Sequence, residues 1–150
     1  MFQPSFIRFI IPFSALLLLS ACQSDTQDDI WPMVKDCDLH HQACLSKQGD
    51  AQAILSITPH PIPIAKPLDV EVELQGLEAE KVELDISGLN MYMGYNRVTL
   101  EPQADSGHYK GRSMLAFCTN EVMLWQVSLL VHRKDGEVLQ IPYQLETRNR

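Results

Sequence analysis

Four sulfur-containing residues stand close to turn signals in the second half of the chain. Met91 and Met93 lie in the run GLNMYMG over residues 88–94, Cys118 follows a predicted strand, and Met123 opens the next one. Thioether and thiolate sulfurs are the ligands that Cu(I) selects. In an extended segment, Met-x-Met places both sulfurs on one side because side chains alternate with a period of two. These residues therefore predict a Cu(I) site.

A packing role is the alternative for the same methionines. Methionine commonly fills irregular gaps in hydrophobic cores, and Met123 lies on an apolar stripe that needs no metal to explain it. Met91 and Met93 carry the argument for binding, because a loop gives apolar side chains less reason to occur. Exposed methionine and tyrosine are also typical of protein interfaces, so a structural or protein-interaction role without metal stays open.

Alternation of apolar and polar residues predicts about seven short strands from residue 51 onward. The predicted strands cover residues 51–57, 68–75, 80–87, 96–102, 107–117, 122–132 and 137–145. On the fifth of them, Tyr109, Leu115 and Phe117 share one face. Turn residues separate the strands, and no helical pattern follows the N-terminal region. We expect an all-β fold, a single antiparallel β-sandwich of immunoglobulin type.

The order of these strands sorts their connecting loops between two ends. If consecutive strands run antiparallel, loops 58–67, 88–95 and 118–121 lie at the same end of the sandwich. Cys118 then joins the two loop methionines, and Met123 lies just beneath them. The elements thus predict that the sulfur-containing residues gather at one end.

Three cysteines follow Cys22 in the sequence. A disulfide between Cys37 and Cys44 would close a small loop, which is plausible in an exported domain. It would leave Cys118 as a free thiol, available to a metal or to redox exchange. The alternative pairs Cys118 with Cys37 or Cys44 and leaves the other one free. Strand order slightly favours the first pairing, because the chain enters its first strand at the end opposite Cys118.

The N-terminus has the pattern of an export signal. Arg8 precedes an apolar run over residues 9–19, which is shorter than the roughly 20 residues that span a bilayer. The following Leu-Ser-Ala-Cys resembles the lipobox of bacterial lipoproteins. That resemblance implies a cleaved helical signal peptide over residues 1–21, acylation of Cys22, and a periplasm-facing membrane anchor. Gln23, where Asp would favour retention in the inner membrane, favours the outer membrane.

Composition divides the rest of the chain into three segments, and net charge limits the classes of partner that it can bind. Residues 22–30 are polar and acidic and predict a flexible tether. Residues 31–50 form a cysteine-bearing N-terminal segment, and residues 51–150 form the β-sandwich domain. The net charge of −7 argues against binding to nucleic acid or to an anionic membrane surface, both of which attract basic patches. Contact with the membrane is therefore expected through the lipid alone.

No catalytic motif stands out in the sequence. A nucleophile needs a base within hydrogen-bond reach, and no serine or cysteine is tied to a histidine by a recognisable spacing. The sequence patterns of serine hydrolases, zinc proteases, P-loops and dinucleotide sites do not occur. We therefore expect that the protein is not an enzyme.

Three segments together resemble small periplasmic β-sandwich domains of the YtkA-like and FixH-like kind. They are residues 88–97 (GLNMYMGYNR), 107–111 (GHYKG) and 123–125 (MLW). The resemblance implies copper handling of the cytochrome oxidase assembly type, with a periplasmic metallochaperone or oxidase-assembly protein as partner. Met91 and Met93 match the Met-rich loop of such domains, and Met123 matches their Met-x-Trp strand. The chain departs from copper chaperones with well-defined motifs in lacking a dense set of His and Met.

Overall fold

The part of the chain that the structure describes contains nine strands. The structure is a computed structural model, and it describes residues 29–149. The strands are β1 (Asp29–Ile30), β2 (Cys44–Gln48), β3 (Ala51–Thr58), β4 (Pro67–Gln75), β5 (Lys81–Gly88), β6 (Tyr95–Pro102), β7 (His108–Met114), β8 (Val122–His132) and β9 (Val138–Arg148). The all-β prediction is confirmed for these residues. Among them, no helix is long and apolar enough to cross a membrane.

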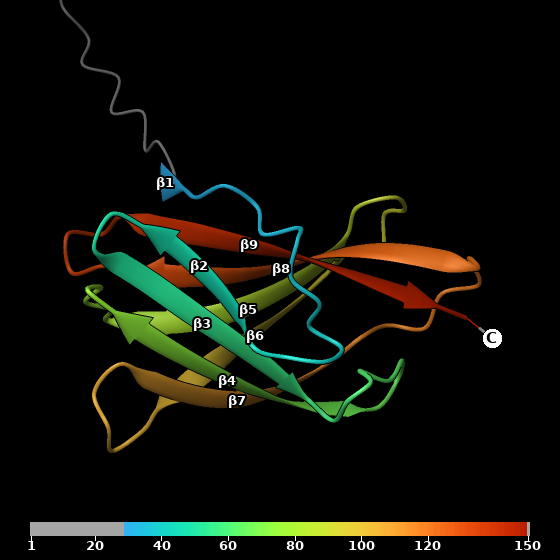
Figure 1. The fold of residues 1–150 in the computed structure, drawn as a ribbon, viewed down its shortest axis with the longest axis horizontal. Coiled ribbons are helices and arrows are strands. Elements are labelled where there is room, and N and C mark those ends of the chain that lie inside the picture. Colours follow the sequence, from blue (N-terminus) through green and yellow to red (C-terminus); the bar gives the residue numbers. More distant parts are fainter. Residues whose placement is uncertain (1–28, 150) are drawn as a thin grey trace, which may run out of the picture.

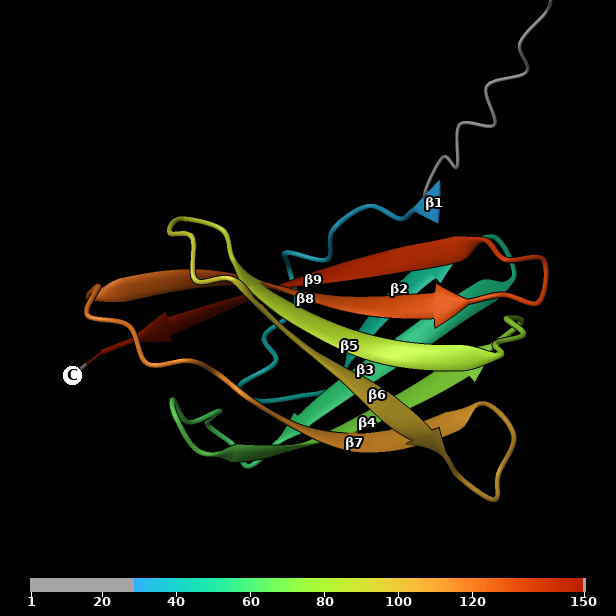
Figure 2. The ribbon, with the colours of Figure 1, turned by 180° about the vertical axis from the view of Figure 1, so that it is seen from behind.

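The strands form one mixed sheet that curls into a half-barrel. Their order is β1-β9-β8-β5-β6-β7-β4-β3-β2, and the β1–β9 pair is parallel while the other pairs are antiparallel. Figure 1 shows β3 and β4 in front, and Figure 2 shows β5 and β6 in front when the molecule is seen from behind. β6 joins the two halves, because residues 95–100 lie beside β5 whereas residues 101–102 pair with β7.

The predicted apolar stripes fill the interior between the two halves of the sheet. All five inward residues of β8 are buried: Met123, Trp125, Val127, Leu129 and Val131. A hydrogen bond also crosses the core between two residues that are far apart in the sequence. The hydroxyl group of Tyr143 on β9 donates a hydrogen bond of 3.0 Å to the carbonyl oxygen of Ala53 on β3. Burial raises the pKa of the Tyr143 phenol, so this donor keeps its proton at ordinary pH.

The structure differs from the sequence prediction in strand number and at one strand end. Besides the seven predicted strands, β1 begins inside the predicted tether and β2 lies within the segment 31–50, where it pairs along β3. The two halves also belong to a continuous sheet. The prediction that Phe117 shares a face with Leu115 is wrong, since Leu115 is buried and Phe117 is exposed. β7 ends at Met114, so alternation no longer sets the direction of later side chains.

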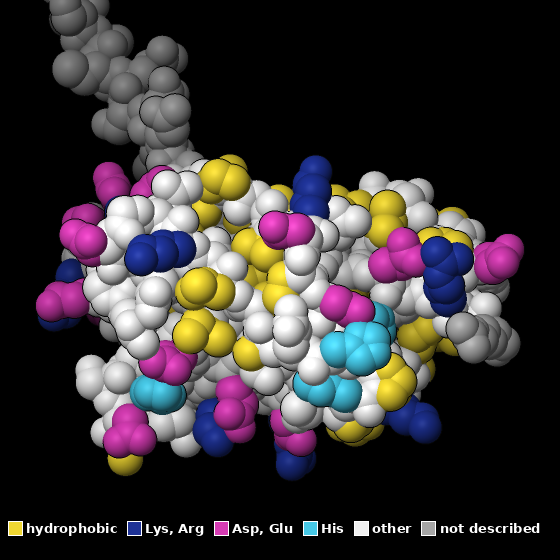
Figure 3. Space-filling model, in the orientation of Figure 1, with side chains coloured by type: hydrophobic (Ala, Val, Ile, Leu, Met, Phe, Trp, Pro, Cys, Tyr) yellow, Lys and Arg dark blue, Asp and Glu magenta, His cyan; other side chains and the backbone are white. Residues whose placement is uncertain are grey.

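Charged side chains of both signs are interspersed over the outer face of β4 and β7 (Figure 3). Lys110 pairs with Glu71 at 2.8 Å, and Arg112 pairs with Asp69 at 3.1 Å, each across neighbouring strands. All four side chains are exposed, and ion pairs in such positions contribute little to stability. This face is the solvated surface expected from the alternating acidic residues.

The predicted signal peptide 1–21, the acylated Cys22 and residues 22–28 of the tether lie outside the described residues. They remain predictions from the sequence. The described chain begins at β1, which lies beside Leu139 and Gln140 at the start of β9, whereas the C-terminus lies beyond the far end of β9 (Figure 1).

Candidate metal centre

Three loops meet at the end of the molecule where β9 finishes. They are residues 59–66, 89–94 and 115–121. The first and third are joined where the backbone N–H of Ala65 donates to the carbonyl oxygen of Leu115 at 3.0 Å. The second is joined to β8 by the N–H of Leu89, which donates to Leu124 at 2.8 Å. The prediction that these loops share one end is confirmed.

Met91 and Cys118 bring two sulfur atoms together at this end. The Cys118 Sγ lies 3.5 Å from the Met91 Sδ, although 27 residues separate them in the sequence. Cys118 is a free cysteine with only 5% of its surface exposed, while Met91 is 39% exposed. A thiol and a thioether thus form a soft pair of donors with one buried and one accessible member.

Met123 lies beneath this pair and is linked to it by Asn120. Its side chain is 2% exposed, and the Asn120 Nδ2 lies 3.8 Å from its Sδ. The backbone N–H of Asn120 points to the Cys118 Sγ at 3.5 Å. Gly88 allows this stacking, since a Cβ there would stand 2.2 Å from the Met91 carbonyl oxygen and 3.4 Å from the Met123 methyl group. A larger residue at position 88 would therefore displace the loop that carries Met91.

Two asparagine side chains hold the sulfur-bearing loops in place. Asn90 pairs with the backbone of β8 through both its Nδ2 and its Oδ1, each at 3.0 Å. Asn149 donates from its Nδ2 to the carbonyl oxygens of Cys118 and Asn120. The sequence analysis did not identify these residues. Asn90 lies in a recognisable turn cluster, but nothing in the sequence near Asn149 indicates its contact with a loop 31 residues earlier.

Met93 lies in a different environment from Met91. It packs against the core and lines a cavity of about 390 Å³ together with Tyr95, Asn96, Met114, Ala116 and Trp125. We call this cavity the slot. The expectation that both loop sulfurs lie on one side assumed an extended segment. Residues 89–94 instead lie outside the strands, and Gly94 has a φ of +68°. The role of Met93 as a ligand therefore has weaker support than that of Met91.

The structure contains the disulfide between Cys37 and Cys44, as the favoured pairing predicted. It closes the loop before β2 and leaves Cys118 as the free thiol. Within residues 29–149, no group of three or more His, Cys, Asp or Glu side chains is arranged to hold a metal ion.

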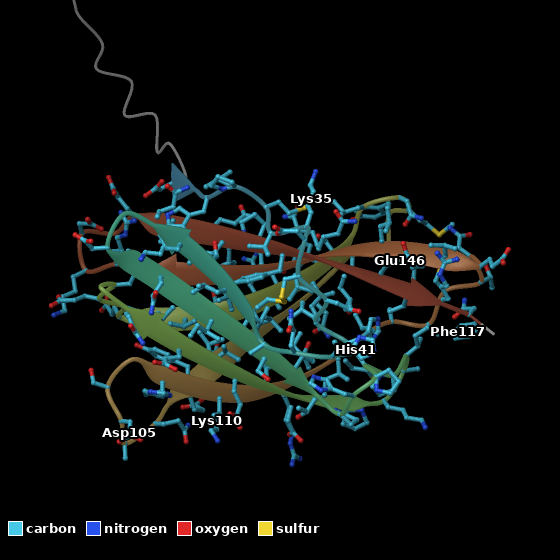
Figure 4. All side chains as sticks on the ribbon, viewed as in Figure 1. Lys35, His41, Asp105, Lys110, Phe117 and Glu146 are labelled. Carbon is cyan, nitrogen blue, oxygen red and sulfur yellow. A yellow bond between two sulfur atoms is a disulfide. The ribbon has the colours of Figure 1, made fainter. Side chains whose placement is uncertain are left out.

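A broader groove lies next to the disulfide loop, and two histidine side chains and one aspartate side chain at its edge are paired within the protein. Lys35, His41, Phe117 and Glu146 line it (Figure 4), and histidine side chains gather on this face (Figure 3). The Nδ1 of His40 accepts the N–H of Ile62 at 3.0 Å, and its Nε2 lies 2.7 Å from the carbonyl oxygen of Glu146. His40 thus serves to tie three segments together.

An ion pair beside this groove is also internally satisfied. Asp38 lies 2.7 Å from the Nδ1 of His41. The backbone N–H of His40, followed by the hydrogen bond from His41, lowers the pKa of the Asp38 carboxyl group. Asp38, His40 and His41 are thus already paired within the protein.

Comparisons with protein-family models and with curated proteins found no significant match for this sequence.

Proposed function

We propose that this chain is an exported lipoprotein, anchored through Cys22, whose loop end binds Cu(I). The observation that carries the proposal is the 3.5 Å contact between the Cys118 Sγ and the Met91 Sδ. Met123 is the proposed third ligand, because Asn120 contacts both the Met123 sulfur and the Cys118 sulfur. Met93 completes the set proposed from the sequence. Thiolate and thioether donors together match the preference of Cu(I) for soft ligands.

The burial of the donors suits a protein that carries copper without catalysing a reaction. Cys118 and Met123 are shielded from solvent, which would protect a bound Cu(I) ion from water and from oxidants. Met91 is partly exposed and would be the ligand through which the ion enters and leaves. We therefore propose a non-catalytic copper-handling accessory module, with a metallochaperone or an oxidase-assembly protein of the periplasm as its exchange partner.

The same proposal covers the cellular location of the protein and its immunoglobulin-like fold. The lipobox-like sequence supports a lipid anchor facing the periplasm, and Gln23 supports the outer membrane over the inner one. An immunoglobulin-like sandwich is supported by the hydrogen bond between Tyr143 and Ala53, which joins facing halves of the sheet across the core.

The first prediction concerns copper affinity. The chain from residue 22 onward, with Cys22→Ser, retains all nine strands and can be titrated anaerobically with Cu(I) against a chromogenic chelator. Met91→Leu combined with Cys118→Ser removes both contacting sulfurs, and we expect the affinity to fall at least about tenfold, or 1.4 kcal/mol.

Met33→Leu is the matched control, because Met33 lies in the N-terminal segment away from the three loops. It should leave both the affinity and the fold unchanged. Equal affinity in the double variant and in the control would refute the proposed copper site.

A protein-interaction role is the second candidate, and one observation favours it. Eight large hydrophobic side chains are exposed among the described residues, and six of them lie at the loop end: Leu89, Met91, Tyr92, Tyr95, Met114 and Phe117. We call these six side chains the apolar cap. Such a concentration of exposed apolar side chains is typical of a binding surface.

A further inference from the structure

The apolar cap combines a protruding aromatic side chain with a cavity that could receive one. Tyr92 is 90% exposed and directly precedes Met93, which lines the slot. The floor of the slot includes Trp125, whose ring nitrogen already donates to the Thr147 hydroxyl group at 2.9 Å. The ring nitrogen is therefore already paired, and the Trp125 side chain as a whole is 2% exposed. Because a protrusion and a cavity occur on the same surface, the surface has the self-complementarity that a twofold interface requires.

The slot also carries an acceptor suited to a tyrosine hydroxyl group. Asn96 uses its Nδ2 to donate to the Ser113 Oγ at 3.3 Å and to the Met114 carbonyl oxygen at 3.0 Å. These two bonds orient the amide and leave its Oδ1 as an acceptor. Buried tyrosine usually finds a hydrogen-bond partner for its hydroxyl group. The slot thus fits an aromatic ring with a polar tip.

The distribution of charge favours a second copy of this chain as the occupant. The full sequence has a net charge of −7, and without Arg8 and the rest of residues 1–21 each copy has a net charge of −8, so two copies repel each other over most approaches. Residues 88–96 and 113–120 contain no charged side chain. Arg97, which stacks on Tyr95 at 5.3 Å, is paired with Asp85 at 3.3 Å. The apolar cap is thus a surface on which two acidic copies can meet without bringing like charges together.

We propose that the apolar cap is the interface of a symmetric homodimer, in which Tyr92 of each copy packs into the slot of the other. The two copies carry the same net charge, so the dimer is expected to be weak and reversible in solution. Aromatic anchors that fill pockets usually carry most of the binding energy of an interface. Tyr92 should therefore dominate the association. This inference does not depend on copper binding.

Sedimentation velocity over about two decades of protein concentration tests the dimer. The metal-free chain from residue 22 onward, with Cys22→Ser, should shift from monomer to dimer as concentration rises. Tyr92→Ala removes the protruding ring, and Ala116→Trp fills the slot from its exposed rim. Each change should weaken the association at least about tenfold, or 1.4 kcal/mol. Leu45→Ala is the control, because Leu45 is an exposed apolar residue on β2 outside the apolar cap.

The outcomes separate this proposal from its alternatives. A dimer that is weakened by both cap variants and not by the control supports it. A monomer at every concentration overturns it, and so does a dimer that is insensitive to both cap variants. If the monomer instead sediments with vesicles of zwitterionic phosphatidylcholine, the apolar cap recognises a lipid surface and the homodimer is refuted. Circular dichroism of each variant checks that the fold is retained.

Discussion

At the scale of single residues, Cys118 and Met91 differ in one property that an experiment can separate. A thiol must lose its proton to bind Cu(I) as a thiolate, whereas a thioether has no proton to lose. The buried Cys118 and the half-exposed Met91 thus make different contributions to the same proposed site. Single substitutions of Cys118 and Met91 should therefore differ in their effect on copper binding.

We expect Cys118→Ser to bind Cu(I) more weakly than the unmodified protein, because only thioether ligands remain. Chelator competition measures both proteins, and Met91→Leu serves as the comparison variant that keeps the thiol. An unchanged affinity in Cys118→Ser would show that the Cys118 sulfur is not a ligand.

At the scale of elements, an ion-pair network links β5 to β8 beside the core. The Oε2 of Glu83 lies 2.7 Å from the Nε2 of His132, and its Oε1 lies 3.2 Å from the Nζ of Lys81. Burial raises the pKa of Glu83, but the hydrogen bonds from His132 and Lys81 outweigh the effect of burial, so the pKa falls below its ordinary value of 4.5. Because folding lowers this pKa, the stabilisation is present above pH 4.5 and is lost as pH falls through the folded-state value.

Glu83→Gln should therefore lower the free energy of unfolding at neutral pH and make stability less sensitive to acid. Urea denaturation at neutral pH and at several values below pH 4.5 measures the effect. Glu71→Gln is the matched control, since Glu71 forms an exposed pair with Lys110 and should change stability little. A loss for Glu83→Gln that is the same at every pH would contradict this account.

Local periodicity explains which elements could be predicted. The alternation from Met123 to Val131 identified β8 and its buried face, since a half-buried strand repeats with a period of two. β1 has two residues and β2 has five, so neither is long enough for a clear alternation, and each depends on pairing with a neighbour.

The candidate site was predictable only as far as strand direction determines it. Antiparallel order brought the loops of Met91 and Cys118 to one end, as the structure confirms. The separation of Met93 from Met91 depends on the bend of residues 89–94, and the role of Asn149 depends on a contact between distant segments. Neither follows from a local pattern of residues.

At the scale of the whole molecule, the first described strand and the apolar cap lie at opposite ends. β1 lies at the start of β9, and the three loops lie where β9 finishes (Figure 2). Met91 belongs both to the proposed copper site and to the apolar cap, so the two proposals are thermodynamically connected.

If dimerisation covers Met91, copper and a second copy compete for it, and each should weaken the binding of the other by the same factor. The apparent affinity for Cu(I) should then fall as protein concentration rises. Tyr92→Ala should remove this dependence because it keeps the protein monomeric. Copper titrations at several protein concentrations measure the effect, and an affinity that is independent of concentration in a protein shown to dimerise would exclude the competition.

X-ray absorption at the copper edge of the Cu(I)-loaded protein tests the central claim most directly, since it identifies the atoms bound to the metal. We predict a first coordination shell of sulfur, with fewer sulfur neighbours in Met91→Leu and in Cys118→Ser and no change in Met33→Leu. A shell of nitrogen or oxygen, or a sulfur shell that neither variant alters, would contradict a copper site formed by Met91 and Cys118.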